Sequence, residues 1–340
     1  MAFLKLSRDG VAGKAALALR CALGVAMIAG PAAVARAQTA SQNYPVKPVR
    51  LIAPFPAGGS SDLIARIVAQ RLSEGFPNQV IVENRPGAGS NLGTQLAARA
   101  APDGYTLLIT SVTAAINATL FKNPGYDLMK DFAPIAKLAV GPTALVVHPS
   151  LPVQNVQQFI KLAQSRPGQL NYGSGGVGTP AHICGEMFRV MGKVNISHVP
   201  YKGTGQSVTD LMAGQTQFVF ASMPVVFPHM KTGRLRTLAV TGAKRTPLAP
   251  NLPTVAESGI PGYAFDSWWG LVTNTGVPPA IVSQLNGEVR RIQQLPDVKE
   301  RFADLGIDVL AGGPAELASF TRSEIDRFAK VIRDTGIRAE

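Results

Sequence analysis

The stretch VRLIAPFPAGGSSD, residues 49–62, joins an apolar run to a glycine-containing loop and a helix start. Residues 49–54 predict a β-strand, and the residues from Ser61 to Ser73 predict a helix. Gly58 and Gly59 allow backbone conformations closed to other residues and leave room for a ligand. The free amides at the start of the helix can bind a carboxylate. The stretch therefore predicts a strand–loop–helix unit whose loop is either an anion site or an ordinary capped turn.

The same pattern continues along the chain. Strands at 79–83 and 105–110 with a helix at 90–99 between them give the order of a parallel α/β sheet with helices on both faces. A second series has strands expected at 143–148, 170–172, 196–199, 217–221 and 236–241, and helices at 156–165, 180–191 and 206–213. After a stretch rich in Pro and Gly, 246–262, we expect a strand at 267–273 and helices at 278–295 and 316–333.

This order predicts two α/β lobes. We assign residues 38–140 and 264–340 to lobe 1 and residues 141–263 to lobe 2. Because the chain crosses between the lobes twice, a hinge and a ligand cleft between them are expected.

Residues 1–37 have the features of a secretory signal. Basic residues precede an uncharged run at 21–35, and the A-x-A sequence at 35–37 offers a cleavage site. The run is too short for a membrane span, and an amphipathic N-terminal helix is the alternative. The rest of the chain contains one cysteine, Cys184, so no internal disulfide is expected. We expect a soluble protein exported to the periplasm.

The composition excludes several classes of protein. Hydrophobic residues make up 46% and charged residues 16% of the chain, whereas a disordered chain is poor in the former and rich in the latter. The net charge of +12 comes from Lys and Arg scattered along the sequence, whereas nucleic-acid-binding proteins cluster them. We therefore expect a folded protein that binds no nucleic acid and mildly favours anionic partners.

The sequence lacks the common motifs of catalysis and cofactor binding. It has no phosphate loop of the G-x-x-x-x-G-K-[ST] type, no H-E-x-x-H, no C-x-x-C and no G-x-S-x-G. The histidines, His148, His182, His198 and His229, lie far apart. Residues 173–178 fit G-x-G-x-x-G, but the following strand, 194–201, has no acid to hold a ribose. No catalytic residue, metal or cofactor is predicted, and this glycine loop is expected to face an anion.

Three glycine loops at strand ends form the candidate ligand site: 54–62, 84–90 and 173–182. Open α/β sheets bind ligands beyond the carboxyl ends of their strands, so loops from both lobes would meet at the cleft. A rigid structural turn is the alternative for 84–90. Trp268 and Trp269 either stack on a ligand or pack where the lobes meet.

A series of short motifs runs through residues 44–340. It comprises PFPAGG at 54–59 with Asp62, VENRPGAG at 82–89, PDGYTLL at 102–108, YGSG at 172–175 with Gly178, Thr179 and His182, VPYKG at 199–203, and LPTVAE at 252–257. This ordered series resembles the Bug family, the extracytoplasmic substrate-binding proteins of tripartite tricarboxylate transporters.

The resemblance implies a two-lobed periplasmic binding protein fold, similar to type II, that closes on a small carboxylate in the cleft between its lobes. Two glycine loops would grip one carboxylate through backbone amides and hydroxyls, often with water. By position, the ligand-binding residues are Phe55, Gly58, Gly59, Ser60, Asp62, Ser174, Gly175, Gly178, Thr179 and His182. The implied partners are the membrane subunits of a tripartite tricarboxylate transporter. We expect a monomer that leaves its ligand chemically unchanged.

Two other functions stay open from the sequence. An exported hydrolase would use Ser60 or Ser174 as its nucleophile, although neither has a recognisable base near it in sequence. A signalling receptor would use the same cleft. The sequence does not identify the carboxylate, the residues that contact its far end, or the cognate membrane subunits.

Overall fold

The computed structural model describes residues 44–339, so the expected signal segment, 1–37, lies outside the described residues. The strands are β1 (Val49–Ala53), β2 (Val80–Asn84), β3 (Thr106–Ser111), β4 (Phe132–Val147), β5 (Asn171–Ser174), β6 (Ser197–Pro200), β7 (Phe218–Ser222), β8 (Arg236–Val240), β9 (Asp266–Asn274) and β10 (Asp308–Val309). The helices are α3 (Ser60–Gly75), α4 (Asn91–Ala98), α5 (Val112–Leu120), α6 (Val156–Ser165), α7 (Pro180–Met191), α8 (Thr204–Met212), α9 (Met223–Lys231), α10 (Pro279–Gln294), α11 (Pro296–Asp304) and α12 (Pro314–Thr335), with a 3-10 turn, η1 (Ala88–Ser90).

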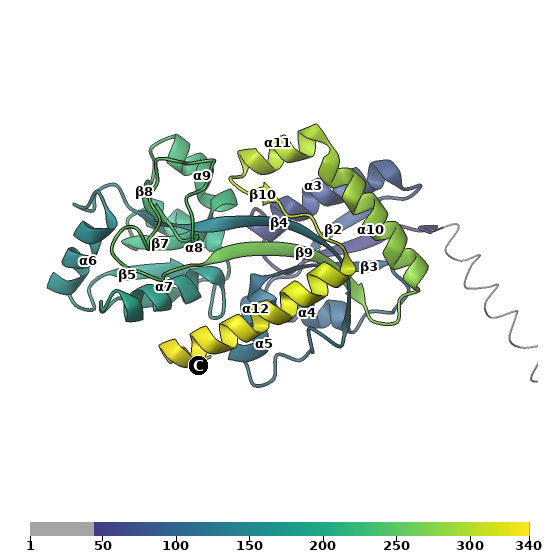
Figure 1. The fold of residues 1–340 in the computed structure, drawn as a ribbon, viewed down its shortest axis with the longest axis horizontal. Helices are drawn as coiled ribbons and strands as arrows, with labels where there is room; N and C mark the ends of the chain where they lie inside the picture. The colour runs from purple at the N-terminus through teal and green to yellow at the C-terminus, as the bar shows by residue number, and fades with distance from the viewer. Residues whose placement is uncertain (1–43, 340) are drawn as a thin grey trace, which may run out of the picture. The chain divides into compact units, whose positions relative to one another are not determined.

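The strands form one mixed sheet in the order β2-β1-β3-β9-β4-β7-β5-β6, with β8 and β10 also paired to β4. β2-β1-β3 and β7-β5-β6 are parallel groups. Between them, β9 and β4 pair antiparallel with each other and with their neighbours (Figure 1). The parallel order predicted for the first series of strands is confirmed in β2-β1-β3, whereas the antiparallel pairs at the centre of the sheet were not predicted. Apolar runs indicate buried strands, but the direction of a strand depends on which end of the sheet the preceding connection reaches.

The long strand β4 changes partners part-way along its length. Residues 132–142 pair with β9, and residues 143–147 pair with β7 and β8. The sequence predicted only the second part, because prolines at 134 and 142 interrupt the apolar pattern of the first. Irregularities in the β9 pairing lie between Pro134 and Ala136 and between Lys137 and Ala139. The change of partners lies near the predicted lobe boundary, and the division into two lobes stays a prediction.

The core follows the periodicity of its elements. All residues of β3 are buried between β1 and β9, as a continuous apolar run predicts for an inner strand. On α12, the buried residues Leu317, Thr321, Glu324 and Phe328 recur at helical spacing, and this helix contacts β4, α5 and α7. In Figure 1, α12 runs along the strands β4 and β9.

Three helices were not predicted from the sequence. α5 buries most of its residues and so lacks an alternation of polar and apolar faces. α9 contains Pro228 in its interior, where a proline usually argues against a helix. α11 begins at Pro296, and only Leu295 separates it from the end of α10.

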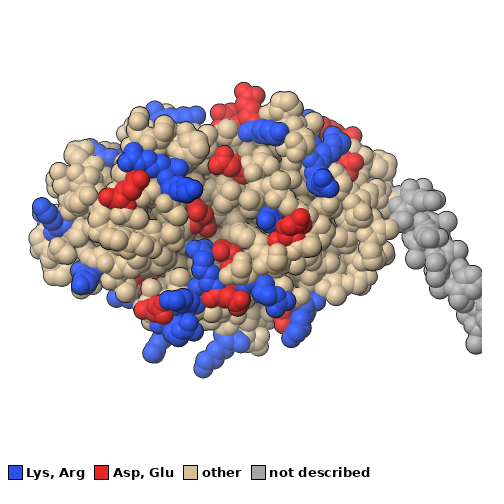
Figure 2. All heavy atoms as spheres, viewed as in Figure 1, with Lys and Arg blue, Asp and Glu red and all other residues tan. Residues whose placement is uncertain are grey.

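Basic and acidic side chains are mixed on the face shown in Figure 2, where Lys and Arg lie among Asp and Glu. Several charged side chains of the described chain pair within one helix, as Lys330 does with Asp334 on α12. Within residues 44–339, no helix combines the length and the apolar character that crossing a membrane requires.

Candidate ligand-binding site

A cavity of about 440 Å³ lies where five helices begin. The N-cap residues of α3, α5, α7, α8 and α9 all line it: Gly59, Ser111, Thr179, Gly203 and Ser222. The first amides of a helix lack intrahelical acceptors, and the helix N-terminus carries a partial positive charge. Within residues 44–339, none of these N-cap side chains bonds to the amides of its own helix. The cavity is therefore surrounded by uncapped donors that suit an anion.

The charge of the cavity wall also favours an anion. Among the described lining residues, Lys202 is the one charged side chain, and no Asp or Glu offsets the helix N-termini. A hydrogen bond to a charged group contributes about 1.5–3 kcal/mol. Four of them would give roughly 6–12 kcal/mol before ordering costs, and micromolar affinity needs about 8 kcal/mol. The wall can thus hold a carboxylate without a metal.

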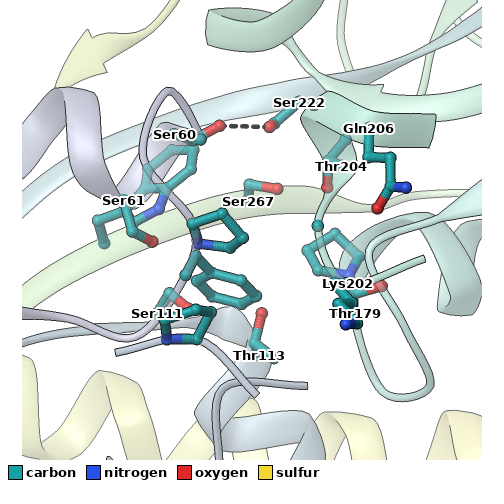
Figure 3. A pocket seen from close by; sticks show the side chains of 18 of the residues that line it. Ser60, Ser61, Ser111, Thr113, Thr179, Lys202, Thr204, Gln206, Ser222 and Ser267 are labelled. Atoms are coloured by element: carbon teal, nitrogen blue, oxygen red, sulfur yellow. Dashed lines mark hydrogen bonds between the residues drawn. The ribbon is translucent and has the colours of Figure 1, made fainter. Parts of the chain in front are cut away.

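Hydroxyl groups supplement the backbone donors (Figure 3). They belong to Ser60, Ser61, Ser111, Thr113, Thr179, Thr204, Ser222 and Ser267. The Oγ atoms of Ser60 and Ser222 lie 2.6 Å apart, so a hydrogen bond joins the start of α3 to the start of α9. Phe55, Val112, Pro180 and Trp269 add apolar surface to the same wall. This combination suits a small organic anion with an apolar body.

Asp62 holds the first glycine loop in place. The residue is 2% exposed, and its carboxylate accepts hydrogen bonds from the Gly58 amide (2.8 Å), Asn84 Nδ2 (2.9 Å) and Arg66 Nε (3.0 Å). Burial alone would raise the pKa of Asp62, but the hydrogen bonds from Arg66, Gly58 and Asn84 outweigh it and lower the pKa. Gly58 has a φ of +78°, which glycine adopts readily. The carboxylate therefore fixes the loop that precedes α3.

Ser174 and two histidines hold the glycine loop at 173–182. The Ser174 side chain is fully buried, and its Oγ accepts from the Gly176 amide (3.0 Å) and lies 2.6 Å from His198 Nε2. The Gly178 amide donates to His182 Nδ1 (3.3 Å), and the two imidazole rings pack with centroids 4.5 Å apart. The serine thus has a base beside it in space. It does not line the cavity, however, so the pair is not placed to attack a ligand there.

We expect this histidine pair to make folding stability fall between pH 6.5 and pH 4. Burial, followed by the charge of His182, lowers the pKa of His198 from 6.5 to about 4. Over that range the unfolded chain binds a proton that the folded chain does not, so acidification favours unfolding. The loss is about 2 kcal/mol, because residual solvent exposure moderates the shift. Denaturant unfolding at a series of pH values measures it.

The variant His198→Gln should flatten this pH dependence, whereas His148→Gln, at a half-buried site outside the pair, should leave it unchanged. An equally steep loss of stability in His198→Gln would contradict the assignment.

Comparison with known proteins identifies the family. The family model of the tripartite tricarboxylate transporter family receptor matches residues 64–337. The chain belongs to this receptor family. The protein BugT of Bordetella pertussis is 35% identical to it over 304 residues, which cover 89% of this chain and 93% of BugT. The resemblance to the Bug family is thereby confirmed.

Two solved structures resemble this receptor throughout their length. R. palustris Rpa4515 with adipate has a TM-score of 0.84 and 35% identity, covering 87% of this chain and 99% of the other. MatC (Rpa3494) from Rhodopseudomonas palustris with bound malate has a TM-score of 0.81 and 30% identity, covering 85% of this chain and 100% of the other. These likenesses confirm the predicted periplasmic solute-binding fold.

The predicted site residues of this receptor divide into two sets. Phe55, Gly59, Ser60 and Thr179 line the cavity, and Phe55 and Gly175 line a neighbouring one. Gly58, Asp62, Ser174, Gly178 and His182 line neither of these two cavities and instead bond within the loops. Direct ligand contact by any member of the two sets stays a prediction.

Several lining residues of the receptor were missed from the sequence. Ser111 and Ser222 each end an apolar strand directly before a helix, so they carry the strand–helix signal without a glycine loop. Lys202 lies within the VPYKG motif that supported the resemblance. On β9, Trp269 faces the cavity, whereas Trp268 Nε1 donates to Glu324 (2.9 Å), as the alternation of side chains along a strand requires.

The histidines of the receptor do not assemble with acids or cysteine into a metal site. Within residues 44–339, no group of three or more His, Cys, Asp or Glu side chains could hold a metal ion.

Proposed function

We propose that this receptor captures a small carboxylate and delivers it to the membrane subunits of a tripartite tricarboxylate-type transporter. The observation that carries the proposal is the convergence of five helix N-termini on one cavity whose described lining contains Lys202 and no acidic side chain. Uncapped amides, hydroxyls and one cation favour an anion small enough for about 440 Å³. The similar structures that contain adipate and malate support a carboxylate as that anion.

In this proposal the predicted residues have two roles. The amides and hydroxyls of Gly59, Ser60 and Thr179 bind the carboxylate, and the ring of Phe55 packs against the body of the ligand. Gly58, Asp62, Ser174, Gly178 and His182 keep the two glycine loops in the conformation that presents those donors. Gly175 lines the neighbouring cavity. A ligand gripped in this way is bound and released without chemical change.

The two lobes, residues 38–140 with 264–340 and residues 141–263, close on this ligand in the proposal. Contacts between them in the structure support it. The Ser60–Ser222 hydrogen bond joins α3 to α9, and Gly203 lies against Pro56, because a Cβ at 203 would be 2.8 Å from Pro56 Cγ. We further propose that segment 1–37 directs a monomeric receptor to the periplasm.

The test is a thermal-shift screen of residues 38–340 against carboxylic acids. A ligand that binds only the folded state raises the unfolding midpoint, by about 2.7 kcal/mol of stabilisation at a hundred times its Kd. We expect carboxylates to shift the midpoint and the matched primary amides to leave it unchanged. No shift with any carboxylate would reject the proposal.

Mass spectrometry of the identified ligand after incubation with the protein separates a receptor from a hydrolase. We expect the ligand to be recovered intact, and its conversion by the pure protein would overturn the receptor function.

A further inference from the structure

Asn117 lies on α5 between two glycine loops. It is completely buried, with an exposed fraction of 0%. Its Nδ2 donates to the carbonyl oxygen of Gly89 (2.7 Å), in the loop 84–90, and to Oδ1 of Asn91 (2.9 Å), at the start of α4. Because a carbonyl oxygen only accepts hydrogen bonds, the bond to Gly89 fixes which end of the Asn117 amide faces that loop. The side chain therefore holds loop 84–90 and turns its own oxygen away from it.

That oxygen faces Gly178, in the loop 173–182. A Cβ at 178 would lie 2.3 Å from Asn117 Oδ1 and 3.3 Å from side-chain atoms of Leu120 and Phe121. We call these three side chains the Gly178 socket, because only a residue without a side chain fits against them. Oδ1 has no hydrogen-bond partner among residues 44–339. Buried amide oxygens are normally paired, so this one forgoes a hydrogen bond where it packs against the loop.

The two glycine loops also touch each other directly. A Cβ at Gly89 would lie 2.5 Å from the carbonyl oxygen of Val177, so the backbones of the two loops are in contact. In the proposed division of the chain, Gly89 and Asn117 belong to lobe 1, whereas Val177 and Gly178 belong to lobe 2. Both contacts therefore join the lobes, and separation of the lobes would empty the Gly178 socket.

The socket lies directly beside proposed ligand donors. Thr179, which follows Gly178, is the N-cap of α7 and lines the first cavity, the one of about 440 Å³. Ser111 and Thr113, at the start of α5, line the same cavity, and Asn117 lies one helical turn beyond Thr113. The seating of Gly178 in its socket therefore sets where Thr179 lies relative to the start of α5.

We propose that Asn117 is a positioning residue of the receptor. It seats Gly178 when the lobes close, and so holds loop 173–182, with Thr179, against loop 84–90 around the bound ligand. Asn117 lines neither of the two cavities, so it acts through the loops and not on the ligand. A contact that forms on closure stabilises the closed state and therefore slows ligand release more than it speeds association. This inference rests on the proposed function, because it needs a ligand around which the lobes close.

The first experiment is a double-mutant cycle, with affinities from calorimetry and rates from stopped-flow kinetics. Adipate and malate are the first probes, and a carboxylate from the thermal-shift screen replaces them if neither binds. We expect Asn117→Ala to speed ligand release about 3- to 10-fold and to change association less than about twofold. Gly178→Ala places a methyl group against Asn117 Oδ1 and should weaken binding about tenfold or more.

The double variant Asn117→Ala/Gly178→Ala separates a socket from a general loss of structure. Removing the Asn117 amide relieves the clash, so the double variant should bind at least about threefold more tightly than Gly178→Ala alone. Independent effects would instead make it bind more weakly than either single variant. An affinity that shows such additivity, or an unchanged release rate in Asn117→Ala, overturns the proposal.

The control for backbone strain is Gly214→Ala. Gly214 has a φ of +75°, close to the +80° of Gly178, but nothing lies within 4 Å of a Cβ there. It should bind as the unsubstituted protein does. Unfolding midpoints without ligand verify that each variant is folded, and the release rate of Asn117→Ala tests the proposal even if Gly178→Ala does not fold.

A disulfide between cysteines at 117 and 178 tests the contact without any ligand. The end of the Asn117 side chain is so near a Cβ at 178 that Asn117→Cys/Gly178→Cys is within reach of a disulfide. We expect it to form on oxidation, and the oxidised variant to give a more compact scattering curve than the reduced one. Failure to form it, with and without ligand, overturns the proposed socket and leaves the proposed function intact. Failure of every carboxylate to bind the unsubstituted protein overturns the proposed function, while the disulfide still reports on the socket.

Discussion

Replacing Gly203 by valine is expected to weaken carboxylate binding about 10- to 100-fold. Gly203 is the buried N-cap of α8 and lines the first cavity. A Cβ there would lie 2.8 Å from Pro56 Cγ, on the loop that precedes α3. The φ of Gly203 is −175°, which any residue adopts, so the effect comes from the contact and not from backbone strain. Overpacking of this kind costs about 1–3 kcal/mol and forces apart the two loops that surround the ligand.

Calorimetry with a carboxylate identified in the screen measures the affinity, and small-angle scattering reports whether the ligand still compacts the protein. Gly287→Ala on α10 is the control, because Gly287 belongs to the lining of neither cavity and nothing lies within 4 Å of a Cβ at 287. It should bind as the unsubstituted protein does and be slightly more stable, since alanine favours a helix over glycine. Unchanged affinity in Gly203→Val would show that the closeness of these two loops is irrelevant to binding.

Replacing Asp62 by alanine is expected to cost about 3 kcal/mol of folding stability and to abolish tight binding. The substitution removes the acceptor for the Gly58 amide and for Asn84, and leaves both donors without it. Hydrogen bonds to a charged group contribute about 1.5–3 kcal/mol each. The pairing with Arg66 adds little, because the arginine side chain is 55% exposed and solvent screens it. Without this carboxylate, the loop at 54–60 loses the contacts that fix its conformation.

The pH dependence distinguishes this explanation from a simple loss of packing. The pKa of Asp62 is lower in the folded state than the ordinary value of 3.8. The stability it contributes is therefore present above that value and is lost as the pH falls through the folded pKa. Denaturant titrations of the unsubstituted protein and of Asp62→Ala should converge at acid pH. Asp334→Asn, which breaks an exposed ion pair on α12, should leave the unfolding midpoint unchanged at every pH. A constant difference between the two titrations would contradict this role.

Much of the local structure followed from the sequence because burial leaves a periodic signal. The prediction for α6 coincides with the helix observed, Val156–Ser165, since Val156, Phe159 and Ala163 recur at helical spacing and Asn155 caps its first turn. The glycine loops at 54–62 and 173–182 were located for a similar reason, because each follows an apolar run and precedes a helix. The first half of β4 and the helix α9 were missed where proline interrupts the pattern.

The sequence alone predicted only part of the candidate site. Sequence position suggested Asp62 and Ser174 as ligand contacts, since both lie in glycine loops. In the structure their polar atoms are engaged by backbone groups of those same loops, and only the folded chain shows which way each side chain turns. Ser222 shows the opposite case, because only its place at the end of an apolar strand marks it locally, yet its hydroxyl meets Ser60 from a distant part of the chain.

The sequence by itself determined the alternation of strands and helices, the glycine loops and the membership of the receptor family. The first two are local patterns within single segments. The third follows from an ordered series of short motifs along the chain. The tertiary structure alone decided that β4 and β9 run antiparallel between two parallel groups, and that the starts of α3, α5, α7, α8 and α9 meet at one cavity. The physical reason is that a residue pattern encodes which face of an element is buried. It does not encode which distant elements bury it, and the anion site consists of donors from five such elements.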